Sequence, residues 1–167
     1  LREEINFQLA LFHLNHGLRG QEALRDQKFC IEWAKKRNLK IFVEQYDVRS
    51  YKKELSISLE EAARKVRYQK LKEVAEVWKA DKIALGHHRN DQIETILMNI
   101  IRGTGVNGLR GMPLKNDKFI RPLLRTPLEE IHQYLQERKL SFVIDSTNID
   151  QSFLRNRIRH ELIPLLK

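Results

Sequence analysis

A short polar stretch at residues 86–95 carries the strongest chemical signal in the sequence. Its two acidic residues, Asp91 and Glu94, are three positions apart, and Arg102 follows further along. On a helix these spacings place all three side chains on one face. Two carboxylates in that arrangement could bind an amino group, hold a magnesium ion or accept a proton.

Two other interpretations apply to the same stretch. Acidic residues at a helix start also favour the helix dipole without any chemistry. A metal site formed by His87, His88 and Asp91 is a second alternative, but adjacent histidines at a strand end point to opposite faces. We therefore assign no residue as a metal ligand.

A glycine-rich turn follows the same helix. Gly103 and Gly105 come directly after Arg102, and glycines let backbone amides approach a phosphate while the arginine pairs with it. Turns use the same pattern constantly. The dinucleotide-binding fingerprint would instead lie at the first turn between strand and helix.

Several groups of basic side chains could contact phosphates. They are His13 with His16, Arg64 with Arg67 beside Tyr68, and Arg155 with Arg157, Arg159 and His160. Solvent-exposed arginines on a helix, or histidines satisfied in a core, are the ordinary alternatives. The net charge of +9 and the isoelectric point near 9.8 favour anionic partners weakly.

The composition is that of a globular protein with one domain over residues 1–167. Apolar residues make up 41% and charged residues 32%, and no stretch suits a membrane span or a signal peptide. Cys30 is the only cysteine, so no disulfide can form within the chain and a reducing cytoplasm fits best. It lies on the apolar face of its helix, where we expect an inert core residue.

Strands and helices alternate along the chain. The patterns predict strands at residues 7–14, 41–48, 82–85 and 141–144. They predict helices at 22–37, 58–78, 90–102 and 126–139, and a basic helix at 153–167. This order favours an α/β fold with a doubly wound parallel sheet, in which ligands bind beyond the carboxyl ends of the strands.

Local signals define some helix ends and faces. Asn38 suits a left-handed stop, and Ser58 with Glu61 forms a capping box. A second capping box is expected at Thr126, with Pro127 at the first helical position. In the helix at 90–102, we expect the isoleucines to face a core and the acidic residues to lie opposite. In the basic helix we expect a buried leucine and isoleucine stripe that includes Leu165.

Motifs in a fixed order along residues 11–166 resemble one known family. They are His13-Leu-Asn-His-Gly-Leu-Arg19, Ala63-Arg-x-x-Arg-Tyr68, Gly86-His-His-x-x-Asp-Gln-x-Glu-Thr95, Arg102-Gly-Thr-Gly105, Gly108-Leu-x-Gly-Met112, Arg121-Pro-Leu-Leu124, Asp145-x-Thr-Asn148 and Arg155-Asn-x-Ile-Arg159. Each is modest alone, whereas the ordered set is specific. The chain resembles the tRNA(Ile)-lysidine synthases, which are N-type ATP pyrophosphatases (PP-loop proteins).

The resemblance implies a definite reaction. Such ligases use ATP to adenylate the wobble cytidine of tRNA(Ile) with a CAU anticodon, and the side-chain amine of lysine then attacks C2. The products are lysidine, AMP and diphosphate. The resemblance also implies an adenine-nucleotide alpha-hydrolase-like (Rossmann-like) fold, Mg²⁺ with the ATP, and a cytoplasmic location without membrane association; a homodimer is left open.

The resemblance also implies roles for individual residues. Asp91 and Glu94 would bind lysine, and one of the two would help to remove its proton, since attack requires a neutral amine. Arg102 and Arg121 would stabilise the phosphate or the adenylated intermediate. The remaining assignments are ATP binding by His16, Arg64, His87, Gly103 and Gly105, and tRNA binding by Arg67, Arg155, Arg157 and Arg159.

The sequence departs from the family pattern in two ways. The phosphate loop Ser-Gly-Gly-x-Asp-Ser is not found, so we expect this loop and the first strand upstream of Leu1, and the chain by itself to be inactive and poorly stable. Asn90 stands where the family commonly has an aspartate, which weakens any magnesium role there.

Three alternatives stay open at this point. A tRNA thiolase of the same fold would need catalytic cysteines, and Cys30 is single. Another PP-loop ligase that amidates a small molecule would not need the basic terminal helix. A non-catalytic RNA-binding module would not need Asp91 and Glu94.

Overall fold

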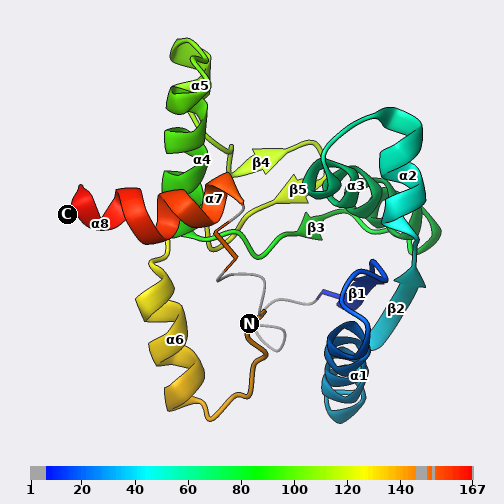
Figure 1. Ribbon diagram of the computed structural model, residues 1–167. Coiled ribbons are helices and arrows are strands. Elements are labelled where there is room, and N and C mark those ends of the chain that lie inside the picture. Colours follow the sequence, from blue (N-terminus) through cyan, green and yellow to red (C-terminus); the bar gives the residue numbers. More distant parts are fainter. Residues whose placement is uncertain (1–6, 146–149, 152, 167) are drawn as a thin grey trace. The chain divides into compact units, whose positions relative to one another are not determined.

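The computed structural model describes residues 7–145, 150–151 and 153–166, and the chain divides into two compact units, residues 1–80 and 81–167 (Figure 1). Most of the motif predicted at residues 145–148 falls outside the described residues. The expectation of a single domain stays a prediction.

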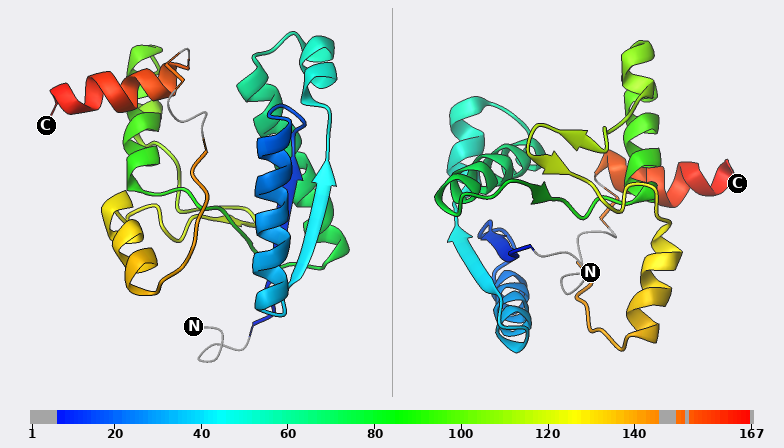
Figure 2. Two further views of the ribbon diagram at one scale, coloured as in Figure 1. Left: turned by 60° about the horizontal axis from the view of Figure 1, so that its bottom comes forward. Right: turned by 180° about the vertical axis from the view of Figure 1, so that it is seen from behind.

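The first unit is built on a β-α-β arrangement. Strands β1 (Ala10–Asn15) and β2 (Lys40–Gln45) pair in parallel over their whole length, and α1 (Gln21–Lys36) connects them. Figure 2 shows α1 lying alongside this strand pair. A parallel pair needs such a crossover, so the predicted order of elements is confirmed here.

Helices cover both faces of this strand pair. On one face, the Asn15 side-chain amide donates to Gln27 Oε1 of α1 at 3.0 Å. On the other face, the Phe42 ring meets Trp78 edge-on at 5.6 Å, at the end of α3 (Leu59–Val77). Since neighbouring strand residues point to opposite faces, the strand pair is wound on both sides, as expected for this fold class.

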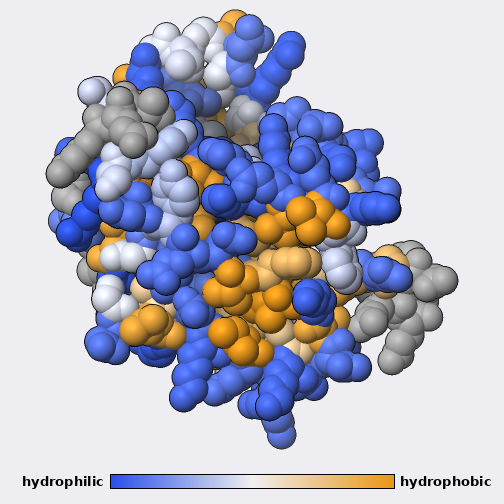
Figure 3. Space-filling view, turned by 90° about the vertical axis from the view of Figure 1, so that its right-hand side faces the viewer, coloured by the Kyte–Doolittle hydropathy of each residue, from blue (hydrophilic) through white to orange (hydrophobic). Residues whose placement is uncertain are grey.

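The first unit also contains α2 (Val48–Leu55), which packs on α3. Its core includes Val48, Ala62 and Val66. Other apolar side chains, such as Val43 of β2, stay at the surface. Figure 3, viewed from the β2 side, shows a group of hydrophobic residues among hydrophilic ones. Some apolar side chains on this side are therefore exposed at the surface instead of being buried in a core.

The second unit contains a small mixed sheet. Its strands are β3 (Ile83–Ala84), β4 (Lys115–Asn116) and β5 (Phe119–Ile120). Strand β5 lies in the middle, parallel to β3 and antiparallel to β4. The helices are α4 (Arg89–Ile101), α5 (Val106–Leu109), α6 (Leu128–Glu137), α7 (Leu154–Arg157), the π-helical segment η2 (Ile158–Leu162) and α8 (Ile163–Leu165).

The strand predicted at residues 141–144 is wrong. This segment is irregular; the Phe142 ring stacks on His132 of α6 at 5.5 Å, and Ile144 is exposed. The partner of β3 is β5, which a hairpin turn at Asp117 (φ 54°) brings into place. Strands of two residues leave no periodic pattern in a sequence.

The expected buried face of α4 is also wrong. Glu94 and Met98 are buried, whereas Ile93, Ile100 and Ile101 are at least 40% exposed. Apolar periodicity assumes that charged residues stay in solvent, and that assumption fails where a carboxylate is paired.

The predicted helix signals have mixed outcomes. Asn38 adopts a left-handed φ of 51°, and Ser58 Oγ accepts from the Glu61 N–H at 3.1 Å, so both predictions are confirmed. The capping box at Thr126 is wrong, because α6 begins at Leu128 with Pro127 as its cap residue. The basic helix is confirmed over residues 154–165, with a π-helical turn in its middle.

Candidate functional site

The first turn of α4 holds Asp91 in a fixed orientation. His88 is the cap residue of this helix, and its backbone N–H donates to Asp91 Oδ2 at 2.9 Å. The His88 ring nitrogen Nε2 lies 3.4 Å from the same oxygen. Asp91 therefore points back toward the carboxyl end of β3, and its side chain stays 15% exposed.

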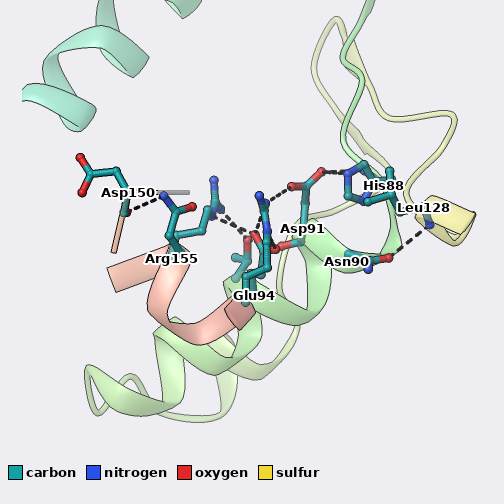
Figure 4. A network of polar contacts seen from close by, with 10 residues as sticks. His88, Asn90, Asp91, Glu94, Leu128, Asp150 and Arg155 are labelled. Carbon is teal, nitrogen blue, oxygen red and sulfur yellow. Dashed lines mark hydrogen bonds and ion pairs between the residues drawn. The ribbon is translucent and has the colours of Figure 1, made fainter. Parts of the chain in front are cut away.

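Glu94 lies one turn further along α4 and is fully buried. Arg159 Nε donates to Oε1 at 2.6 Å and Arg159 Nη2 to Oε2 at 3.1 Å, which makes a bidentate pair. Arg155 Nε lies 3.3 Å from Oε2 (Figure 4). Burying a carboxylate costs several kcal/mol unless it is paired in this way. A Glu94 without its arginine partners would therefore unfold the site.

Arg159 connects the two carboxylates. Its Nη2 also lies 3.9 Å from Asp91 Oδ1. The hydrogen bonds to Glu94 and the charges of both carboxylates raise the pKa of Arg159 against the opposing effect of burial. Two carboxylates and two guanidinium groups thus form one neutral cluster.

The segment 154–165 presents these arginines because of its helical spacing. Arg155 and Arg159 are four residues apart and lie on one side, with Ile158 buried between them in sequence. Arg155 Nη2 also donates to Thr95 Oγ1 of α4 at 3.2 Å. Side chains on the other side stay in solvent: Arg157 is 59% exposed, and Leu165 is 84% exposed, so it does not belong to a buried stripe as expected.

The arginines that converge on the carboxylates are therefore not those expected. Arg102 is exposed at the end of α4, and no described residue forms an ion pair with it. Arg121 is buried, and its Nη1 donates to the Pro113 carbonyl at 2.9 Å. Gly103 has a φ of 70° after α4, and Gly105 is the cap residue of α5.

Two polar residues of α4 hold other segments in place, a role that the sequence did not suggest. Asn90 Oδ1 accepts from the Leu128 N–H at 3.3 Å, so it serves the start of α6. Gln92 Oε1 accepts from the Met112 N–H at 2.7 Å, and Gln92 Nε2 donates to the Met112 carbonyl at 3.1 Å. Capping from a distant helix leaves no local motif, which is why both roles were missed.

A separate basic cluster lies at the end of β1 in the first unit. Arg67 Nη2 lies 3.1 Å from His16 Nε2. An arginine can only donate, so Nε2 accepts and the proton of the neutral ring sits on Nδ1. Burial and then the charge of Arg67 lower the pKa of His16 to about 4. Nδ1 is itself buried without a hydrogen-bond partner among the described residues.

The other residues expected at the nucleotide have simple environments. The Arg64 guanidinium lies over the Tyr68 ring at 4.9 Å and donates to its hydroxyl at 3.3 Å. His87 is partly buried after β3. Cys30 is partly buried, and burial raises the pKa of its thiol, as expected for an inert residue.

A metal ion would need several donor side chains gathered in one place. Within residues 7–145, 150–151 and 153–166, no three His, Cys, Asp or Glu side chains are grouped so as to hold an ion. Both oxygens of Glu94 are occupied by arginines instead. The magnesium that the sequence resemblance implies therefore has no side-chain cradle in the part described.

The sequence also matches a known protein family. The sequence pattern of the PP-loop domain matches residues 1–166. The chain belongs to the PP-loop domain family. This confirms the nucleotide-binding class that the ordered motifs indicate, and ATP use follows from the family.

The PP-loop domain described here has several similar curated relatives. The tRNA(Ile)-lysidine synthase of Thermosipho africanus is 41% identical over 167 residues, which are 100% of this chain and 39% of that protein. The tRNA(Ile)-lysidine synthase of Pseudothermotoga lettingae is 42% identical, and the match covers 100% of this chain and 37% of that protein. That of Bacteroides thetaiotaomicron is 40% identical over 161 residues, with 96% and 38% covered. The chain thus spans about two fifths of the length of the curated relatives it matches.

A solved structure resembles this PP-loop domain in fold. The U34-tRNA thiolase NcsA from Methanococcus maripaludis, described with its [4Fe-4S] cluster, has a TM-score of 0.70 at 18% identity. The match covers 99% of this chain and 64% of that one. It supports the Rossmann-like α/β class and no more. Along the described residues, no helix is long and apolar enough to span a membrane.

Proposed function

We propose that this PP-loop domain catalyses lysidine formation on tRNA(Ile), as part of a cytoplasmic tRNA(Ile)-lysidine synthase. The observation that carries the proposal is the 41% identity to such an enzyme along all 167 residues. It is supported by a partly exposed carboxylate, Asp91, held rigidly beyond the end of β3, where α/β proteins bind their ligands.

In the proposed reaction, ATP and the CAU-anticodon tRNA come first. The cytidine O2 attacks the α-phosphate, diphosphate leaves, and an adenylated cytidine results. The neutral ε-amine of lysine then attacks C2, AMP leaves with the O2 atom, and one amine proton is released. Asp91 orients the amine and accepts this proton, which requires a carboxylate within hydrogen-bond reach of the nitrogen.

Other residues have proposed roles in binding ATP and tRNA. In the first unit, ATP binding is proposed for His16, as a neutral donor through Nδ1, and for Arg64. In the second unit, the same role is proposed for His87, Gly103 and Gly105. Arg67 and Arg157 contact the tRNA backbone. Arg102 is exposed and free to contact a phosphate. Arg121 would act by holding the loop at Pro113, and Arg155 and Arg159 would act by holding Glu94. ATP would be used together with Mg²⁺, and the proposal does not depend on whether the protein forms a homodimer.

The test is transfer of labelled lysine. The protein that carries these 167 residues is incubated with ATP, labelled lysine and tRNA(Ile), and label in the tRNA is measured together with AMP release. Controls omit ATP or replace the wobble cytidine by uridine. AMP release that depends on tRNA but not on lysine would instead indicate another ATP-dependent tRNA modification, and release without tRNA an amidating ligase. Tight tRNA binding without any AMP would indicate a binding module.

A further inference from the structure

Glu94 and Asp91 differ in whether a substrate can reach them. Both Glu94 oxygens accept from Arg159, and the side chain has no exposed area. Asp91 keeps an exposed edge, and among the described residues its Oδ1 has only the 3.9 Å contact with Arg159. In this arrangement a lysine amine can approach Asp91 and cannot approach Glu94.

Arg159 has one guanidinium group to divide between two carboxylates. Its distances of 2.6 and 3.1 Å to Glu94, against 3.9 Å to Asp91, place it with Glu94. Arg155 contacts Glu94 and donates a hydrogen bond to Thr95. If Glu94 lost its charge, the Asp91 carboxylate would still lie 3.9 Å from Arg159 Nη2 and could attract that guanidinium group.

We propose that Glu94 is a positioning residue that holds Arg159 away from Asp91 and so keeps the Asp91 charge available for the lysine amine. The inference rests on the proposed function for its substrate, and on the ion-pair geometry for its mechanism. Glu94 itself touches no substrate. A charge-assisted pair that forms at Asp91 competes directly with an ammonium or amine ligand there.

The variants Glu94→Gln, Arg159→Met and the double variant test this role. Glu94→Gln keeps the shape but frees Arg159 to pair with Asp91, so the KM for lysine should rise about tenfold or more, since each 1.4 kcal/mol is tenfold. The KM for ATP should stay unchanged. Adding Arg159→Met removes the competitor, so the double variant should recover most of the lost lysine affinity.

Two outcomes would overturn the proposal. If Glu94 contacts lysine directly, the double variant stays as poor as Glu94→Gln. If Arg159→Met alone raises the lysine KM as much as Glu94→Gln does, Arg159 is not a competitor; this variant keeps Arg155 paired with Glu94 and serves where Glu94→Gln fails to fold. Glu94→Gln combined with Arg138→Met is the matched control, which should restore nothing because Arg138 is exposed at the end of α6 and lies over the Tyr134 ring instead.

Thermal unfolding of the same variants separates this proposal from the proposed function. The midpoint should fall for Glu94→Gln, and Arg159→Met should lower it little further in that background, because the shared contact is already lost. Fully additive losses would contradict the pairing. A wild-type protein that transfers no lysine, yet shows this non-additivity, would overturn the proposed function and leave the pairing intact.

Discussion

Asp91 and Glu94 differ by one methylene group and by the neighbours that the fold gives them. His88 fixes Asp91 through its backbone N–H, whereas Arg155 and Arg159 enclose Glu94. The sequence predicted that both acids share a helix face, because helical spacing requires it. It could not separate their roles, since the arginines lie more than 60 residues away in the chain.

At the scale of single residues, we expect Asp91→Asn to reduce lysine transfer far more than it reduces ATP binding. Asparagine keeps the size but cannot accept a proton, and a positioned general base contributes about 10²- to 10⁴-fold. The kcat/KM for lysine should fall by at least about 100-fold, while ATP affinity, measured by calorimetry, stays within a factor of about two. Glu60→Gln, at an exposed position of α3, is the control. Equal loss of both quantities would remove Asp91 from the lysine site.

The second prediction at residue scale concerns His16. Its pKa of about 4 in the folded protein lies below the ordinary 6.5 because of burial and Arg67. The unfolded chain then binds more protons at acidic pH, so this residue's contribution to stability is complete above pH 6.5 and is lost as the pH falls toward 4. A histidine NMR titration should give a midpoint near 4 for His16, and Arg67→Met should raise it. A midpoint near 6.5 in the wild type would contradict the Arg67 contact.

At the scale of elements, the first turn of α4 fastens separate segments of the second unit. The Arg89 N–H donates to the Thr126 carbonyl at 3.0 Å, Asn90 serves α6, and Gln92 holds the backbone at Met112. The same turn presents Asp91. The site therefore depends on the loops that α4 holds as much as on the helix itself.

Replacing Asn90 by alanine should loosen the start of α6. The Leu128 N–H loses its acceptor, and loss of such a cap costs about 1 kcal/mol, partly offset by the better helix propensity of alanine in α4. Hydrogen exchange of the first-turn amides of α6 should be several-fold faster, with a small change in global unfolding. Gln133→Ala, on the exposed side of α6, is the control. Unchanged protection at Leu128 would show that the cap contributes nothing.

Gly111 should tolerate no side chain. Its φ is 60°, and an added Cβ would lie 2.6 Å from the Gln92 amide nitrogen. Left-handed backbone costs an ordinary residue about 1–2 kcal/mol, and displacement of Gln92 adds to this. Urea unfolding of Gly111→Ala should show that loss, whereas Gly86→Ala, with open space and ordinary φ, should lose well under 1 kcal/mol. Equal stability of the two variants would contradict this packing.

The elements divide into those that the sequence could predict and those that it could not. Helices α1 and α3 follow from apolar stripes and local signals such as Asn38 and Ser58, and β1 and β2 from apolar runs. Strands β4 and β5 have two residues each and exist only through pairing. The buried face of α4 depends on distant arginines, and so no local pattern contains it.

At the scale of the whole molecule, the net charge of +9 overstates the surface that is free to bind an anion. Arg155 and Arg159 are used within the fold to balance Glu94. Arg157, on the same segment, points into solvent, and within the described part of the chain it has only a 3.6 Å contact with Glu161. Charge counted along a sequence cannot distinguish these cases.

We therefore expect Arg157→Ala to weaken tRNA binding in a salt-dependent way. Loss of one phosphate contact should make the slope of log K against log salt less steep by up to about one unit. Filter binding across a salt series measures this slope. Lys28→Ala, at a cation of α1 that is more exposed than Arg157, should leave the slope unchanged. Identical slopes for both variants would remove Arg157 from the tRNA contact.

The long separation between Glu94 and Arg159 also has a consequence for biosynthesis. The two residues are 65 positions apart, and ribosomes add about 5–20 residues per second, so Arg159 follows Glu94 by roughly 3–13 s. During this interval α4 can form, but its central carboxylate has no guanidinium to enclose it and must stay hydrated. The nascent second unit can therefore close its charged core only after the arginine-bearing helix has left the ribosome.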